Sequence, residues 1–175
     1  MILNGGGFPL ISIIVPVYNM VSGGKLVNCL DSLLSQKMTD YEIIAVDDAS
    51  TDESLQVLRK YEEKYPDLVK VQALSENHRQ GGAKNVGLDM CLGEYVGFVD
   101  SDDWVLPDMY QRLVSKAMDT GADMVACNLT HVYEHTMQVD KNIPSMDEDM
   151  NGELTTDRLK RLTFQSGALV CRIYR

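Results

Sequence analysis

The sequence contains no long apolar run. A membrane-spanning helix needs roughly 18 or more consecutive apolar residues, and no stretch of the chain reaches that length. The first residues also lack the basic region, long apolar segment and cleavage site of a secretory signal. We therefore expect a cytoplasmic protein without a transmembrane segment, in which any membrane contact is peripheral and at the inner face. Residues 1–10 are predicted to be an irregular leader outside the fold.

Cysteine and histidine are scarce and widely spaced. The chain has no Cys-x-x-Cys pair, which argues against a zinc or redox motif, and its four cysteines are expected to be reduced core thiols: Cys29, Cys91, Cys127 and Cys171. Among the three histidines, His131 and His135 are spaced to share one helix face, but no acidic or third ligand accompanies them. We predict no zinc site.

Basic residues are also in short supply. The chain has 16 lysines and arginines against 26 aspartates and glutamates, so its net charge is −10 and its pI is near 4.6. This surplus would repel a nucleic-acid backbone over most of the surface, and we expect no nucleic-acid partner. The length of 175 residues and the apolar fraction of 45% suit a single globular domain with a substantial core.

Short apolar runs alternate along the chain with segments of helical period. The runs predict strands at residues 11–15, 41–46, 69–73, 95–99, 124–129 and 168–174, of which 69–73 alternates with polar residues as an edge strand does. The intervening segments predict helices, with a capping box at 50–53 opening the second and Pro107 opening the fourth. This alternation is typical of a doubly wound α/β sheet, mainly parallel. Residues 134–152 predict a loop, and 155–164 a short helix.

The most informative motif is an acidic run directly after an apolar strand. Residues 99–103 read Val-Asp-Ser-Asp-Asp, and three carboxylates so close together repel one another unless a cation neutralises them. Hard cations take oxygen ligands, and a Mg²⁺ site commonly combines one or two carboxylates with substrate phosphate oxygens. The run therefore predicts Mg²⁺ or Mn²⁺ and a nucleotide-phosphate ligand. The alternative is a solvated acidic turn that precedes the helix near Pro107.

Polar clusters follow three of the predicted strands. They are Tyr18-Asn19, Asp47-Asp48 and residues 100–103, and an open parallel sheet binds ligands beyond the carboxyl ends of its strands. One crevice is therefore expected to collect all three clusters. Asp48 is the candidate to accept an N–H hydrogen bond from a flat base, although the same carboxylate would also suit a helix N-terminus.

Two cations precede or begin the third predicted helix. Arg79 lies in the segment before it and Lys84 one turn inside it, so both could reach phosphate or ribose oxygens, unless they are ordinary solvated surface cations. The paired glycines at 81 and 82 suit a close approach of the backbone to a bound molecule. These signals are weak when taken one at a time.

Taken together, four motifs resemble the nucleotide-sugar glycosyltransferases of family 2, which have the GT-A fold. They occur in that family's order at residues 16–19 (PVYN), 46–52 (VDDASTD), 81–88 (GGAKNVGL) and 98–103 (FVDSDD). The resemblance covers residues 11–107 well, and 170–175 is similar to a strand that the family places before its catalytic base. It implies a nucleotide-sugar-binding core over residues 11–130. Residues 131–175 would then hold the acidic loop, short helix and strand that begin the acceptor half.

The resemblance also implies roles for individual residues. Pro16, Tyr18 and Asn19 would lie at the nucleotide, with Asp48 bonding the base. Lys84 stands where the family commonly has arginine, which keeps the charge and loses the bidentate fork, and Arg79 stands where glycine is common. Asp100 and Asp102 form the family's Asp-x-Asp motif, in which Asp102 binds the metal and Asp100 contacts the ribose or a metal-bound water.

The implied reaction is an inverting transfer of a sugar, of hexosyltransferase type. A UDP-sugar is the first choice of donor, a saccharide or lipid-linked hydroxyl is the acceptor, and polysaccharide biosynthesis is the setting. Mg²⁺ or Mn²⁺ would stabilise the departing diphosphate while a carboxylate takes the acceptor's proton. The resemblance places that base beyond Arg175, and the acidic residues 147–149 are interpreted as a solvated loop instead.

Three other functions compete with this one, and the position of the motifs disfavours the first two. A haloacid-type phosphatase needs its Asp-x-Asp pair after the first strand, whereas this pair follows the fourth. A dinucleotide-dependent oxidoreductase needs a Gly-x-Gly-x-x-Gly after the first strand, and the chain has none there. A non-catalytic module that binds nucleotide-sugar or metal without turnover would carry the same binding motifs.

Overall fold

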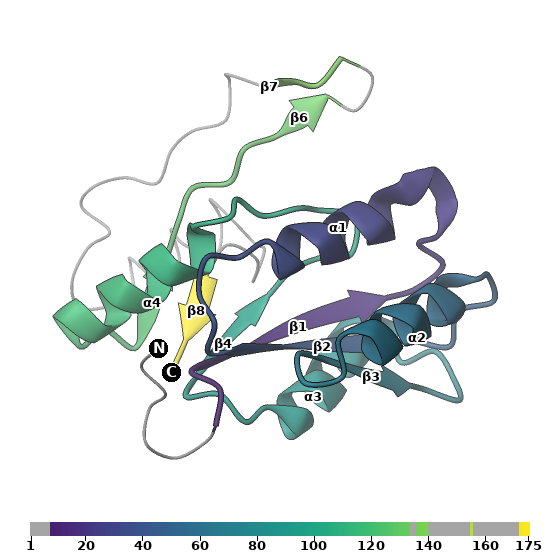
Figure 1. Cartoon of the computed structure of the whole chain (residues 1–175), viewed down its shortest axis with the longest axis horizontal. Coiled ribbons are helices and arrows are strands. Elements are labelled where there is room, and N and C mark those ends of the chain that lie inside the picture. The colour runs from purple at the N-terminus through teal and green to yellow at the C-terminus, as the bar shows by residue number, and fades with distance from the viewer. Residues whose placement is uncertain (1–7, 134–135, 140–154, 156–171) are drawn as a thin grey trace.

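The computed structural model describes residues 8–133, 136–139, 155 and 172–175. Its main sheet consists of β1 (Ile11–Val17), β2 (Tyr41–Asp47), β3 (Val69–Ala73), β4 (Tyr95–Phe98), β5 (Met124–Ala126) and β8 (Arg172–Tyr174). The helices are the 3₁₀ turn η1 (Ser22–Gly24), α1 (Lys25–Leu34), α2 (Ser54–Lys64), α3 (Arg79–Met90) and α4 (Met109–Thr120). The short strands β6 (Val132–Tyr133) and β7 (Gln138–Val139) pair separately and project away from the sheet (Figure 1).

The sheet confirms the predicted doubly wound α/β fold. Its strand order is β3-β2-β1-β4-β8-β5, and the β1–β2, β2–β3 and β1–β4 pairs are parallel. β8 is antiparallel to both of its neighbours, so the sheet is mixed at one side. The chain moves outward from β1 through β2 to β3 and then returns to place β4 on the other side of β1. The point where strand order reverses therefore lies between β1 and β4, which is where such sheets bind ligands.

Helices cover both faces of the sheet (Figure 1). The larger core joins alternate residues of β1 and β2 to apolar side chains of α1, α2 and α4, and the smaller core packs Ile14, Ile44 and Val46 against α3. Because β1 and β2 are buried on both faces, they need the continuous apolar runs seen in the sequence. β3 alternates buried and exposed residues at the sheet's edge, as its sequence predicted.

Several predicted boundaries are wrong for local reasons. The capping box at 50–53 does not form, because α2 begins at Ser54 without a side-chain cap and the Ser50 hydroxyl accepts the Asn19 N–H instead. Pro107 is not the first helical residue: its carbonyl accepts the Lys37 N–H, and α4 begins at Met109. α3 begins at Arg79, so the glycines at 81 and 82 lie inside its first turns.

The C-terminal predictions are tested only in part. The strand predicted at 124–129 ends at Ala126, because 127–131 runs on as irregular chain. The last strand is described over Arg172–Tyr174, and residues 168–171 lie outside the described part, as do 140–152 and 156–164. The prediction of a continuous loop over 134–152 is wrong at residues 138–139, which pair with β6 as the strand β7. Within the described ranges, Cys29, Cys91 and Cys127 form no disulfide; Cys29 is buried as predicted, whereas Cys91 and Cys127 are only partly buried. No helix in those ranges combines the length and apolar character needed to cross a membrane.

Candidate functional site

The carboxyl ends of β1, β2 and β4 meet at one edge of the sheet. Val17 pairs with Asp47 at the end of β1, whereas β4 stops earlier, with Phe98 beside Ile14. The last residues of β1 therefore have no neighbour on β4. The buried Pro16, which has no N–H to donate, thus costs no hydrogen bond on the β4 side. This edge brings together the three polar clusters that the sequence placed after the strands.

Asp47 and Asp48 are both buried at the end of β2. Asp48 is 2% exposed, and its Oδ1 accepts the backbone N–H of His78 at 2.7 Å. Asp47 Oδ2 accepts the Ser50 N–H at 3.2 Å, whereas its Oδ1 has no hydrogen-bond partner among the described residues. The contact from His78 ties Asp48 to the start of α3.

The first turns of α3 also reach the acidic run. Asp100 Oδ1 accepts hydrogen bonds from Gln80 Nε2 at 2.8 Å and from Lys84 Nζ at 3.1 Å. Lys84 is 8% exposed, and its ammonium lies 5.7 Å from the centre of the Phe98 ring. The interpretation of Lys84 as a solvated surface cation is therefore wrong, because the carboxylate and the ring compensate a buried charge. α3 thus links Asp48 to Asp100 across the end of β1.

The acidic run forms a tight turn. The Asp103 N–H donates to the Asp100 carbonyl at 3.0 Å, and the Asp102 side chain is exposed. Burial raises the pKa of Asp103, and the neighbouring Asp102 and Asp100 raise it further. Burial raises the pKa of the Cys29 thiol to about 12, with further contributions from Asp103, Asp102 and Asp100. The turn therefore concentrates negative charge, and its Asp102 carboxylate faces solvent.

The acidic turn fits a hard cation only with help from a ligand. Among the residues that the structure describes, no three His, Cys, Asp or Glu side chains converge on a common point. An exposed Asp102 can supply one carboxylate, and the like charges of Asp100, Asp102 and Asp103, which Lys25 and His131 offset only in part, favour a cation. Phosphate oxygens of a ligand would have to complete the coordination shell, which is how Mg²⁺ is commonly bound.

The loops of this rim contain backbone in the left-handed region. Asn19, Ala49 and Arg79 have φ of 51°, 58° and 64°. Asn19 and Ala49 lie just after β1 and β2, and Arg79 is the first residue of α3. The Asn19 amide oxygen accepts the N–H groups of Thr51 and Asp52 at 2.7 and 3.3 Å. Asn19 therefore holds two rim loops together, and clustering of such backbone is frequent at binding sites.

Tyr18 and Arg79 complete the set of predicted residues at the rim. Tyr18 is 46% exposed, so its side chain is accessible to a ligand. Arg79 is also exposed, and its backbone N–H donates to the Asn77 side chain at 3.0 Å. Gln80 was missed by sequence reasoning. Its signal was the spacing of four residues before Lys84, which puts both side chains on one face of α3.

A cavity of about 1120 Å³ adjoins the acidic turn on the side of α4. Its wall includes the chain immediately after the turn, with Trp104 and Leu106 half-exposed or more. The opposite side is formed by α4, β5 and the irregular chain that follows β5, including Arg112, Val125 and Leu129. The acidic turn thus lies between the Asp48 end of the rim and this mainly apolar cavity.

Comparison with known proteins agrees with this architecture. The model of the family described as glycosyl transferase family 2 matches residues 12–175. The uncharacterized glycosyltransferase YibD of Escherichia coli (strain K12) is 36% identical over 146 residues, or 83% of this chain and 41% of YibD.

Solved structures resemble the chain as well. The structure of S. aureus TarS 1–349 in complex with UDP-GlcNAc has a TM-score of 0.71 at 29% identity, and the match covers 94% of this chain and 45% of that one. The mannosyltransferase PcManGT from Pyrobaculum calidifontis in complex with GDP-Man and Mn²⁺ has a TM-score of 0.62 at 28% identity, over 69% of this chain and 36% of that one.

The chain spans less than half the length of YibD, TarS 1–349 and PcManGT. Its six-stranded sheet and helices have the GT-A arrangement of the TarS structures. With the family model matched from the first strand to Arg175, the chain belongs to glycosyl transferase family 2.

Proposed function

We propose that the rim binds a nucleoside-diphosphate sugar together with Mn²⁺ or Mg²⁺ and serves an inverting, hexosyltransferase-type sugar transfer. The observation that carries the proposal is the link made by the start of α3. Its residues contact Asp48 through the His78 N–H and Asp100 through Gln80 and Lys84. Asp48, which suits a nucleobase, and Asp100, which suits the diphosphate end, are therefore fixed relative to one another. The UDP-GlcNAc and GDP-Man complexes of the related structures support a nucleotide-sugar ligand.

The rim residues divide into two groups in this proposal. Asp48 accepts an N–H from the base, the half-exposed Tyr18 ring lies against it, and Pro16 forms the floor at the end of β1. Asn19 contributes by fixing the loops around the base, since its amide oxygen is already engaged there. A carboxylate that accepts a base N–H contributes about 1.5–3 kcal/mol.

The second group would hold the diphosphate end. Asp102 is the proposed metal ligand, and Asp100 contacts the ribose or a metal-bound water while Lys84 compensates its charge. When bound there, the cation supplies the positive charge that stabilises a departing diphosphate. Asp103 adds to the negative field that attracts a cation to this turn.

The acceptor is proposed to approach through the cavity beside the acidic turn. A saccharide or lipid-linked hydroxyl entering there would meet Trp104 and Leu106. The proton of that hydroxyl needs a carboxylate base, which we assign to no described residue, and its predicted place beyond Arg175 stays a prediction. The UDP-GlcNAc and GDP-Man complexes belong to chains of which this one covers less than half, so donor sugar, acceptor and polysaccharide synthesis are proposals for this chain.

Thermal unfolding with UDP tests the binding step. At a ligand concentration about 100 times Kd, binding contributes about 2.7 kcal/mol, or about 5–10 °C in Tm for a domain of this size. We expect that shift with UDP and Mn²⁺ together and a much smaller one with UDP alone. Asp102→Ala should remove the metal-dependent part, whereas Asp89→Ala, which removes an exposed carboxylate at the far end of α3, should not. Equal shifts with and without Mn²⁺ would reject the metal role.

A second candidate function is binding without turnover. It is favoured by the lack of an assigned base among the described residues, since the same rim would bind a nucleotide-sugar and metal without transferring the sugar. Release of UDP from UDP-sugar in the presence of an acceptor separates the two functions. Stabilisation by UDP and Mn²⁺ with no UDP release would favour the binding module.

A further inference from the structure

The loop that carries the acidic run is held along its length by α1. Four hydrogen bonds connect residues 100–107 to α1 or to the turn that follows it. Cys29 Sγ donates to the Asp100 carbonyl at 3.7 Å, and Ser32 Oγ accepts the Val105 N–H at 3.1 Å. Gln36 Nε2 donates to the Leu106 carbonyl at 2.8 Å, and the Lys37 N–H donates to the Pro107 carbonyl at 2.8 Å. We name Cys29, Ser32 and Gln36 the α1 clamp.

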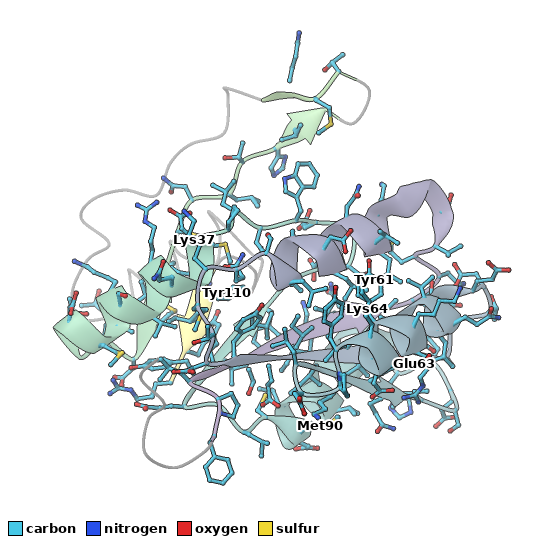
Figure 2. All side chains as sticks on the ribbon, viewed as in Figure 1. Lys37, Tyr61, Glu63, Lys64, Met90 and Tyr110 are labelled. Carbon is cyan, nitrogen blue, oxygen red and sulfur yellow. The ribbon has the colours of Figure 1, made fainter. Side chains whose placement is uncertain are left out.

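Gln36 makes the most contacts in the α1 clamp. Its side chain is 7% exposed, and besides the bond to Leu106 it donates to the Ser32 carbonyl at 3.2 Å and accepts the Tyr110 N–H at 3.2 Å. Figure 2 labels Lys37 and Tyr110, which lie where the chain after α1 is bonded to Pro107 and to the start of α4. Because these groups are buried, water cannot readily replace a lost partner. Gln36 thus fixes both the end of the acidic loop and the beginning of α4.

The burial pattern of the loop shows what the clamp orients. Ser101 and Val105 are buried, at 5% and 8% exposure, and Val105 packs in the core shared with α1. Asp102 and Trp104, which lie between them, are exposed. Bonds to the backbone at Asp100, Val105 and Leu106 hold both ends of this segment. The exposed side chains are thereby presented from a fixed backbone.

We propose that Ser32 and Gln36 are positioning residues, which hold the acidic loop so that Asp102 faces the ligand before the ligand arrives. This inference rests on the proposed function as far as the metal is concerned. Neither residue contacts the rim itself, and both act through the backbone of the loop. Direct hydrogen-bond partners of metal ligands commonly affect metal affinity by 10–100-fold, and these two residues, which act through the loop backbone, should act at the lower end of that range.

Trp104 reports on the loop without any ligand, because it is the only tryptophan of the chain and lies in the clamped segment. Gln36→Met keeps the size of the side chain but removes its three hydrogen bonds. We expect stronger acrylamide quenching of Trp104 and a red shift of its emission. The matched control is Tyr61→Phe, which removes the bond from Tyr61 Oη to Asp31 Oδ1 at 2.8 Å on the α2 side of α1, and should change neither. Ser32→Ala is a second, smaller perturbation, expected to change both in the direction of Gln36→Met.

Titration of Mn²⁺ into protein saturated with UDP tests the functional part. Gln36→Met should weaken Mn²⁺ binding by about tenfold, and Tyr61→Phe should leave it unchanged. Unaltered Trp104 quenching and Mn²⁺ affinity in Gln36→Met and Ser32→Ala would overturn the inference, as would equal losses in Tyr61→Phe. If the unsubstituted protein binds no UDP with Mn²⁺, the proposed function fails. The Trp104 measurement then still decides whether the α1 clamp holds the loop.

Discussion

The ion pair between Lys84 and Asp100 allows a quantitative prediction from the structure. The Nζ to Oδ1 distance is 3.1 Å, and the side chains are 10% and 27% exposed respectively. A charge-assisted hydrogen bond contributes about 1.5–3 kcal/mol. In Lys84→Met, Gln80 still donates to Asp100 and water reaches the carboxylate, so we expect a loss of about 1–2 kcal/mol. In Asp100→Ala the more deeply buried ammonium loses its carboxylate, and we expect about 2–4 kcal/mol.

The double-mutant cycle isolates the pair. Once either partner is absent, removal of the other should cost little, so the double variant should be more stable than the sum of the single losses predicts, by about 1–2 kcal/mol. Urea unfolding of the four proteins measures each free energy of unfolding, provided that the m-values agree. Additive losses, or a larger loss from Lys84→Met than from Asp100→Ala, would refute the assignment of Lys84 as a buried cation neutralised by Asp100.

Three further predictions concern stability. The raised pKa of Asp103 means that the folded state disfavours the ionised carboxylate. The protonated carboxyl therefore contributes stability below the ordinary pKa of 3.8, and this contribution is lost as pH rises through the higher folded pKa. Asp103→Asn should raise Tm at pH 7, and this gain should vanish near pH 3. In Gly81→Ala the added Cβ meets nothing within 4 Å, so the substitution should stabilise α3 by about 0.5–1 kcal/mol. In Gly87→Ala the added Cβ lies 2.5 Å from Ile14 Cγ2, so the protein should be destabilised by about 1–3 kcal/mol. Similar urea midpoints for the two variants would contradict this. Ala49→Gly relieves a left-handed φ of 58° and should raise stability by about 0.5–1 kcal/mol in the same assay.

The sequence predicted the sheet because its strands are chemically distinctive. β1 and β2 are buried on both faces, and only continuous apolar runs satisfy that environment. Polar residues directly after the apolar runs of β2 and β4 had to lie at the carboxyl edge of a parallel sheet, which places Asp48 and Asp100 at one rim. The order of four motifs then indicated the family.

Long-range hydrogen bonds could not be predicted in the same way. Ser50 has capping-box spacing, yet its hydroxyl accepts the N–H of Asn19, 31 residues earlier, so a tertiary contact replaced a local one. The bonds from Gln36 to the acidic loop also join residues about 70 positions apart. Lys84 resembled any surface lysine, because only the fold brings Asp100 and Phe98 to its ammonium.

We propose that Asp48 and Asp102 act on opposite ends of one ligand. Calorimetric titration of UDP and of inorganic pyrophosphate, each with Mn²⁺, tests it most directly. Asp48→Asn should weaken UDP binding by about 10–100-fold, equivalent to the loss of one charge-assisted bond, and leave pyrophosphate unaffected. Asp102→Ala should weaken both ligands in the presence of Mn²⁺. Equal weakening of both ligands by Asp48→Asn, or unchanged UDP binding in both variants, would show that the two carboxylates do not act on opposite ends of the ligand.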